Sequence, residues 1–332
     1  MTQHTDNFGL LRLILALLVV LGHFRILPGA TPEGIFTYAD FAVDAFFIIS
    51  GYLVYASFDK TPVIGSFYIR RLFRIYPLYF VIVCIQGVGM ALIAGGITAH
   101  ASELAHYFAV NLIMANFLAY DLGDLLRNFH NPGINPSLWT LKIEVAFYFL
   151  LPLLWYCTRR FGTRFLIFIY IASTLYTVLA LHYGDEIIAR QLPGKLRFFV
   201  IGFALYHYRD SFRFSLPVNV GVLLAASALC AFRAQMWLLP VYPLLLGIVV
   251  SICALRLPVV PLSSDISYGV YLFHGPLIQF ALLLGIFQAT PAFLALLLIT
   301  VCALAYLAEH AIERPGINLG HRLSSLWTKH HG

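Results

Sequence analysis

The chain has 332 residues and a formal net charge of +6; 61% of its residues are hydrophobic and 11% are charged. Ordinary soluble domains carry about 25% charged residues, so this composition, with a mean hydropathy of +0.84, excludes a soluble globular enzyme and predicts a polytopic membrane protein. The excess of Lys and Arg is typical of the cytoplasmic loops that set membrane topology, and it does not indicate a nucleic-acid partner.

Ten apolar runs are candidates for spanning helices, since about 20 mostly apolar residues cross a bilayer. We therefore predict an all-α fold, a polytopic transmembrane helical bundle forming one integral membrane domain over residues 1–332. The segment 313–332 is predicted to be a short cytoplasmic tail. In chain order the ten runs are roughly 9–27, 38–58, 69–95, 137–157, 163–183, 195–208, 216–233, 237–256, 264–287 and 290–312.

An eleventh run, residues 104–120, contains His106, Asn111 and Asn116, and such polar side chains are costly in the hydrocarbon core. If this run spans the membrane, the Lys and Arg residues divide almost evenly between the two sides. If it is a re-entrant or interfacial helix on the outer side, most of them lie on the inner side, as the positive-inside rule requires. We therefore expect about ten spanning helices, one re-entrant or interfacial helix, and both termini in the cytoplasm.

The first apolar run carries two polar side chains, Arg12 and His23. Eleven residues at about 100° each return to within about 20° of the starting direction, so both side chains lie on one helix face about 16 Å apart. Either residue alone is more typical of an arginine that extends to the membrane surface, or of a hydrogen-bonded core histidine. Their alignment on one face favours a functional role for the pair.

Two carboxylates lie at a similar depth in other predicted spans, Asp44 near the outer end of the second run and Glu144 near the outer end of 137–157. His23 also lies in the outer half of its helix. A carboxylate that is hydrogen-bonded to a histidine fixes its tautomer and raises its basicity, so the three groups could form a proton-handling site. The alternative is that the carboxylates pair with Arg25 or Lys142 at the outer membrane interface.

Three arginines, Arg70, Arg71 and Arg74, begin the third run at its cytoplasmic end. A guanidinium offers planar, bidentate donors that suit phosphate oxygens. Arginines at this position are also common topology signals that contact the headgroups of membrane lipids. Both interpretations remain open from the residues alone.

The five cysteines lie in or at the ends of apolar runs and have no paired loop spacing. We therefore expect neither a disulfide framework nor a metal site. They are Cys84, Cys157, Cys230, Cys253 and Cys302.

Five ordered motifs, between residue 10 and about residue 277, resemble the acyltransferase 3 family of integral membrane acyltransferases, which are O-acetyltransferase-like proteins. The last apolar run is consistent with this resemblance. The motifs are Arg12-X10-His23, FFIISGYL (46–53), RRLFRIYPLY (70–79), SLWTLKIEVAFYFLLPLL (137–154) and ISYGVYLFHGPL (266–277).

The resemblance implies transfer of an acyl group, most often acetyl, from cytoplasmic acyl-CoA to a hydroxyl group. The acceptor would be a carbohydrate, a lipid-linked sugar or another small molecule, and the protein would lie in a bacterial inner membrane. By this similarity His23 corresponds to the family's essential histidine, Arg12 to its basic partner, and Arg71 and Arg74 to its RxxR pair. Many relatives carry a C-terminal SGNH-type domain, which we do not expect here.

These features combine into one expected mechanism. The phosphates of acetyl-CoA, or of another acyl-CoA, would lie on the arginines of the third run, with Arg12 as a further residue of the acyl-CoA site. His23 would act as general base with Glu144 or Asp44 orienting its ring. The oxyanion could accept hydrogen bonds from Arg12, Ser50 or Tyr271, and the sequence does not distinguish between these three candidates.

Two alternatives stay open. His274, in the motif 266–277, is a second histidine candidate that could equally be a structural partner. A proton-coupled transporter or exporter could use the cluster of His23, Asp44 and Glu144 instead. A transporter should not release CoA from acyl-CoA, which separates the two classes of function.

Overall fold

The computed structural model describes residues 6–211, 215–232 and 238–331, and every regular element in these ranges is a helix. This confirms the predicted all-α fold. Each of the ten predicted spans corresponds to an observed helix, although the two run ends at residues 233 and 237 lie outside the described residues. Long apolar segments adopt helices because a helix satisfies its own backbone hydrogen bonds in lipid.

Six stretches of the described chain are long and apolar enough to cross a membrane, by length and composition. Two shorter apolar helices, Leu216–Cys230 and Tyr242–Leu255, add to them, in rough agreement with the predicted number, and the protein is an integral membrane protein. The six stretches are Phe8–Ile26, Gly34–Lys60, Ile64–Ile93, Leu138–Phe161, Thr163–His182 and Pro291–Lys329.

The chain divides into two compact units, whose boundaries fall inside helices α1, α2, α3 and α5 and between Ser263 and Ser264. The first unit consists of Met1–Arg12, Phe41–Ile64 and Ile143–Ser263, and the second consists of Leu13–Asp40, Gly65–Lys142 and Ser264–Gly332. The single integral domain over residues 1–332 stays a prediction.

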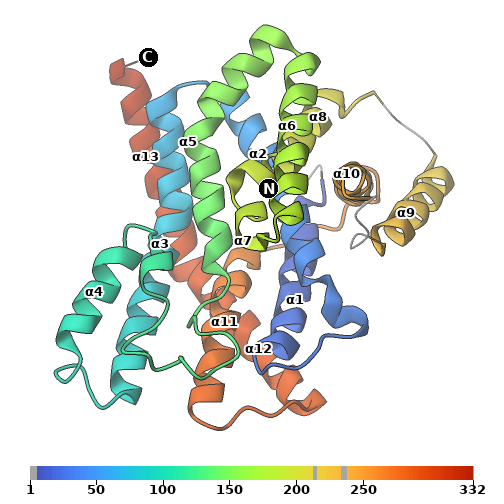
Figure 1. The fold of residues 1–332 in the computed structure, drawn as a ribbon. Helices are drawn as coiled ribbons and strands as arrows, with labels where there is room; N and C mark the ends of the chain where they lie inside the picture. The colour runs from blue at the N-terminus through green and yellow to red at the C-terminus, as the bar shows by residue number, and fades with distance from the viewer. Residues whose placement is uncertain (1–5, 212–214, 233–237, 332) are drawn as a thin grey trace. The chain divides into compact units, whose positions relative to one another are not determined.

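The first unit is built mainly from α2 and from the helices between α5 and α10. Within it α6 packs against α8, and α10 packs against both α8 and α9 (Figure 1). Prolines in the first turn of α8, α9 and α10 favour helix starts, since their missing N–H would have no partner there. The helices are α2 (Ala39–Lys60), α5 (Leu138–Phe161), α6 (Thr163–His182), α7 (Glu186–Ala189), α8 (Leu192–Tyr208), α9 (Leu216–Cys230) and α10 (Tyr242–Leu255).

Helices α2 and α8 approach each other closely at two glycines. A Cβ atom on Gly51 would lie 2.3 Å from the carbonyl oxygen of Phe199, and one on Gly202 would lie 2.3 Å from that of Ile48. Glycine removes the side chains that would keep these backbones apart. Small residues at the Ser50-Gly51 step predict such a close approach from the sequence, and the structure confirms it.

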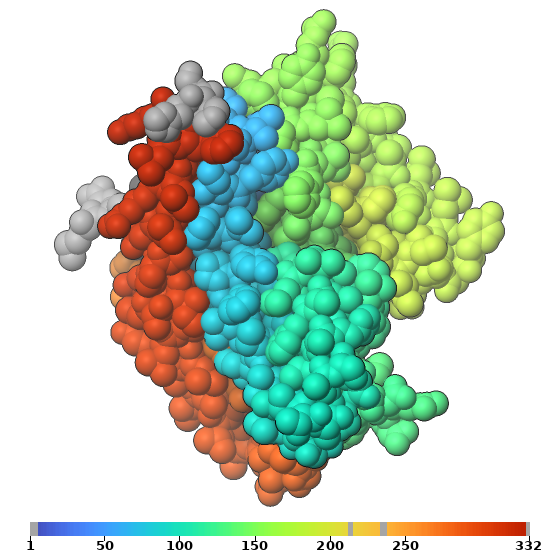
Figure 2. Space-filling model, turned by 90° about the vertical axis from the view of Figure 1, so that its left-hand side faces the viewer, coloured from blue at the N-terminus to red at the C-terminus, as the bar shows by residue number. Residues whose placement is uncertain are grey.

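The second unit contains most of α1 and the helices α3, α4, α11, α12 and α13. Helix α11 packs against α12, and Figures 1 and 2 show α13 side by side with α3. At that contact Gly316 and Gly320 of α13 face Pro77 and Phe73 of α3. The elements are α1 (Phe8–Ile26), the 3-10 turns Gly34–Tyr38 and Asn116–Leu118, α3 (Ile64–Ile93), α4 (Ala101–Asn111), α11 (Ser267–Leu283), α12 (Pro291–Ala308), a π-helix (Glu309–Glu313) and α13 (Arg314–His331).

The limits predicted for the 104–120 run are wrong, because α4 begins at Ala101 and ends at Asn111. Met114 then adopts a positive φ of 61°, which breaks the helix. Eleven residues extend only about 16 Å, against a hydrocarbon core of about 30 Å. The run is therefore too short to cross the membrane as one helix, in agreement with the re-entrant or interfacial helix of the predicted fold.

Residues 313–332, predicted as a short tail, mostly form the helix α13, which continues from α12 through the π-helix. The face of this helix that packs on α3 carries Gly316 and Gly320, whereas Leu319, Leu323 and Leu326 are exposed. The cytoplasmic location of this segment stays a prediction.

Candidate active site

Two histidines of the second unit face each other, His23 of α1 and His274 of α11. His23 Nδ1 lies 2.8 Å from His274 Nε2, and the two rings are stacked with centroids 5.0 Å apart. His274 has no exposed surface, whereas His23 is partly exposed. Of the pair, His23 is thus the more exposed residue.

The buried ring of His274 is held on both of its nitrogens. Its Nδ1 lies 3.1 Å from the carbonyl oxygen of Val270, one helical turn earlier, and Ser137 Oγ lies 3.3 Å from its Nε2. Ser137 is buried as well. Backbone, hydroxyl and imidazole together therefore fix the orientation of His274.

Ser137 begins the motif 137–154, whereas Asn135, two residues earlier, was not singled out from the sequence. The side chain of Asn135 donates to the carbonyl of Leu272 at 3.1 Å and accepts from the backbone N–H of Ser137 at 3.2 Å. The only sequence signal was Asn-Pro-Ser directly before a helix, which is typical of a side-chain-stabilised turn. This turn ties the start of α5 to α11.

Tyr271 lies on the same helix as His274, and its ring contacts the imidazole edge-on at 5.9 Å between centroids. Its hydroxyl forms a hydrogen bond of 2.8 Å with Thr140 Oγ1, and Tyr271 is 9% exposed. Tyr271 thus lies beside the buried histidine, and its role as an oxyanion donor stays a prediction.

Ser50 and Glu144 are brought together in the first unit. Ser50 Oγ donates to Glu144 Oε1 at 2.9 Å, and Tyr148 Oη donates to the same oxygen at 2.6 Å. These two bonds stabilise the carboxylate of Glu144. The hydroxyl hydrogen of Ser50, a predicted oxyanion donor, is already used in this contact.

Asp44, also in the first unit, forms an ion pair with Lys195 of α8, whose Nζ lies 2.7 Å from Oδ1. Both side chains are largely buried, at 11% and 13% exposed. Lys195 further lies over the rings of Phe47 and Phe198. The partner of Asp44 is therefore a lysine that the sequence analysis did not consider.

The three arginines of α3 differ in their surroundings, although all are partly buried. Arg70 donates to Ser66 Oγ at 2.8 Å, and the guanidinium of Arg71 lies 5.9 Å from the ring centroid of Phe67. Arg12, the fourth predicted donor-binding residue, lies on α1 in the first unit and is partly exposed.

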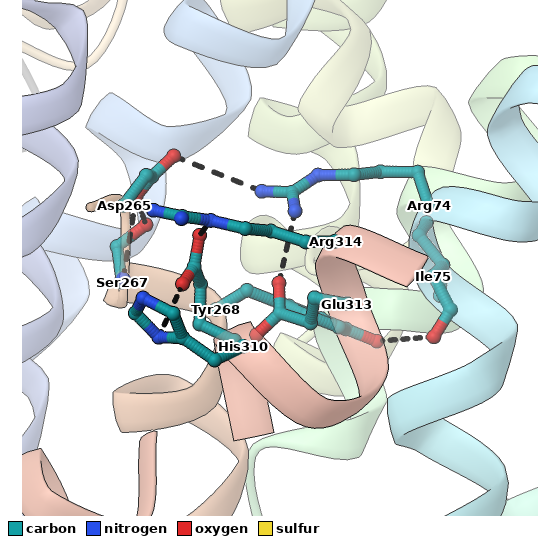
Figure 3. Close-up of polar contacts among 9 residues, drawn as sticks. Arg74, Ile75, Asp265, Ser267, Tyr268, His310, Glu313 and Arg314 are labelled. Atoms are coloured by element: carbon teal, nitrogen blue, oxygen red, sulfur yellow. Dashed lines mark hydrogen bonds and ion pairs between the residues drawn. The ribbon is translucent and has the colours of Figure 1, made fainter. Parts of the chain in front are cut away.

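Arg74 lies between two carboxylates, as Figure 3 shows. Its Nη1 donates to Glu313 Oε2 at 2.9 Å, and its Nη2 lies 3.7 Å from Asp265 Oδ2. The Glu313 side chain is 1% exposed. Neither Asp265 nor Glu313 was predicted as a partner of Arg74. The sequence indicates only that both residues lie near the ends of apolar runs.

Metal ligands do not gather in the described part of the chain, which contains no group of three or more His, Cys, Asp or Glu that could hold a metal ion. The chemistry that the described residues do support is proton transfer, because a partly exposed imidazole is hydrogen-bonded to a fixed second imidazole. Half-buried guanidinium groups supply positive charge for an anionic ligand.

Comparison with known proteins places these residues in a family. The profile of the family described as "Acyltransferase domain" matches residues 6–310. Nodulation protein 10 of Rhizobium leguminosarum bv. viciae is 27% identical over 304 residues, which cover 82% of each chain. The O-acetyl transferase of Shigella phage Sf6 is 24% identical over 328 residues, covering 94% of this chain and 96% of the relative. No solved structure matches the chain.

Proposed function

This chain belongs to the acyltransferase family, and we propose that it transfers an acetyl or other acyl group from acyl-CoA to an acceptor hydroxyl with His23 as general base. The family assignment and the apolar helices make it a membrane-embedded acyltransferase. The hydroxyl acceptor is supported by the similarity to an O-acetyl transferase over nearly the whole chain. The same assignment favours the enzyme over the proton-coupled transporter.

The observation that carries this proposal is the imidazole pair. His23 is partly exposed while its partner is enclosed, and His23 lies on α1 eleven residues after Arg12. A neutral imidazole has one nitrogen that accepts a proton and one that donates a hydrogen bond, so His23 can take up and release a proton within one catalytic cycle. General base catalysis by such a group contributes about 10²- to 10⁴-fold to the rate.

In the proposed reaction His23 takes the proton from the acceptor hydroxyl while the hydroxyl oxygen attacks the carbonyl carbon of the thioester. A C–O bond forms, the C–S bond then breaks, and the thiolate of CoA receives the proton from His23. The products are the O-acyl ester and free CoA. Arg12, Ser50 and Tyr271 stay candidates for stabilising the oxyanion.

We assign the phosphates of the donor to Arg70 and Arg71 at the start of α3. These guanidinium groups have a neutral serine and an aromatic ring among their contacts. Arg74 was expected to join them, but it contacts the carboxylates of Glu313 and Asp265. We therefore propose that Arg74 ties α3 to the π-helix before α13, and that it contributes to the donor site indirectly.

Glu144 and Asp44, which the sequence predicts to orient the ring of His23, stay proposed catalytic residues. Glu144 is held by two hydroxyl groups and Asp44 by Lys195, so both carboxylates are fixed in place. The acceptor itself is proposed to be a carbohydrate, a lipid-linked sugar or another small molecule, and acyl-CoA is the only further ligand proposed.

Cells that express the chain or its His23→Ala variant test the function directly. We expect mass spectrometry of surface glycans and small metabolites to find O-acetyl products with the wild type and none with His23→Ala. His182→Ala, which changes an exposed histidine on α6, should behave as the wild type. Full activity of His23→Ala would refute His23 as the base, and products without acyl-CoA consumption by purified protein would refute the donor.

A further inference from the structure

We propose that His274 is a positioning residue that sets the tautomer of His23, so that His23 presents an unprotonated Nε2 to the acceptor hydroxyl. This inference rests on the proposed function, in which His23 is the general base. The sequence analysis expected a carboxylate to orient His23. In the second unit the contact to the His23 ring is made by a second imidazole, which calls for a different account of the proton positions.

The hydrogen of the neutral His274 ring lies on Nδ1, the nitrogen that does not face His23. Its Nδ1 lies 3.1 Å from the backbone carbonyl oxygen of Val270. A carbonyl oxygen can only accept a hydrogen bond, so Nδ1 must carry the hydrogen. The sequence arranges this contact locally, because residues four apart are bonded through the turn of α11.

The surroundings of His274 determine its charge. The side chain has no exposed surface, and the groups that surround it are neutral: the hydroxyl of Ser137, the ring of Tyr271 and the ring of His23. A second proton would place a charge in this enclosed position without a compensating carboxylate, which is costly. His274 is therefore neutral, and its Nε2 has a lone pair.

The lone pair on His274 Nε2 determines which nitrogen of His23 carries the hydrogen. His274 Nε2 lies 2.8 Å from His23 Nδ1. Because Nε2 of His274 accepts, Nδ1 of His23 donates and carries the hydrogen of the neutral ring. Ser137 Oγ, at 3.3 Å, donates to the same acceptor and keeps it from turning away. The remaining nitrogen, His23 Nε2, is left as the base.

The exposures of the two rings assign their roles. Both nitrogens of His274 are engaged and the ring is fully enclosed, so it cannot touch a substrate. When His23 Nε2 takes the hydroxyl proton, the ring becomes an imidazolium and its bond to His274 strengthens, because hydrogen bonds from charged donors are stronger. The carboxylate of a Ser-His-Asp triad acts on its histidine in the same way, and the wrong tautomer there lowers kcat about 10⁴-fold.

A spectroscopic measurement tests the tautomer without any assay of activity. Wild-type protein labelled with ¹⁵N-histidine, compared with His23→Ala, identifies the two ring nitrogens of His23 by NMR in detergent. We expect a protonated Nδ1 and an unprotonated Nε2. A protonated Nε2 in the neutral ring of His23 would overturn the proposal.

Variants of His274 test the consequence for catalysis. His274→Leu removes the acceptor, so we expect His23 to change to the other tautomer and kcat to fall about 10²- to 10⁴-fold, with the KM for acetyl-CoA unchanged. His274→Gln should recover part of kcat, because its amide oxygen can accept from Nδ1–H. His182→Leu, at an exposed position on α6, is the matched control and should change neither quantity.

The outcomes separate this inference from the function on which it rests. Wild-type kcat in a folded His274→Leu protein, together with an inactive His23→Ala, would refute the role of His274 alone. Activity of His23→Ala would refute the proposed function itself. If His274→Leu does not fold, the NMR measurement on the wild type still decides the tautomer.

Discussion

Replacing Arg74 with alanine distinguishes an arginine that ties helices together from one that binds the donor. Arg74 Nη1 lies 2.9 Å from the Glu313 carboxylate, whose side chain is 1% exposed. The substitution leaves that buried carboxylate without its guanidinium, and loss of one partner of a buried ion pair costs about 3 to 5 kcal/mol. Asp265, at 3.7 Å and 28% exposed, adds at most about 1 kcal/mol.

We take the lower end of that range, about 3 kcal/mol, because Arg74 is itself 24% exposed and water screens part of the interaction. Thermal unfolding in detergent can be followed with a thiol-reactive dye, since all five cysteines are free thiols. Arg74→Ala should unfold at a clearly lower temperature than the wild type. Adding Glu313→Gln to this variant should restore part of the stability, because the buried carboxylate that has lost the Arg74 guanidinium is then replaced by a neutral amide.

Arg70→Ala is the matched control, since its hydrogen bond is to the neutral hydroxyl of Ser66 on the same helix. It should leave the unfolding temperature nearly unchanged and weaken acetyl-CoA binding about 10- to 150-fold, the cost of one charge-assisted hydrogen bond. The interpretation would be refuted if Arg74→Ala unfolded like the wild type and lost donor affinity as Arg70→Ala does. Arg74 would then be a phosphate ligand.

Three further predictions concern packing, pH and topology. Gly51→Val should strongly reduce the yield of folded protein, because the added Cβ would lie 2.3 Å from the backbone of Phe199. Gly221→Ala should fold normally, because no atom lies within 4 Å of the added Cβ. Equal yields of the two variants would contradict the close approach of α2 and α8. The hydrogen bond to Glu103 raises the pKa of His100, in the loop before α4, so the small contribution of this contact to stability is present at low pH and lost as pH rises through the raised pKa. An NMR titration should give a His100 pKa above about 6.5 in the wild type and a lower pKa in Glu103→Gln. Equal pKa values in the two proteins would refute the contact. Reporter fusions after residues 62 and 160 and at the C-terminus should all indicate the cytoplasm, and a periplasmic signal at 160 would mean that the segment containing α4 crosses the membrane after all.

Local features of the sequence were enough to predict the helices. A run of about 20 apolar residues has few alternatives to a helix in lipid, so each predicted span corresponds to an observed helix. The apolar run around them predicted that Arg12 and His23 lie on one helix, as observed. The small residues at the Ser50-Gly51 step predicted a point of close approach between helices. The end of α4 was mispredicted because a single positive φ at Met114 outweighs the apolar pattern around it.

The partners of the candidate site residues were decided only by the tertiary structure. His23 meets His274 across 251 residues of sequence, and Arg74 meets Glu313 across 239. Hydrophobic periodicity shows which face of a helix is apolar, but all faces of these helices are largely apolar, so it does not show which helices meet. The sequence by itself determined the helices and the polar side chains within them. The packing of α1 on α11, and of α3 on the segment before α13, determined which of those side chains could share a proton or a charge, because hydrogen bonds and ion pairs require approach to within about 3 to 4 Å.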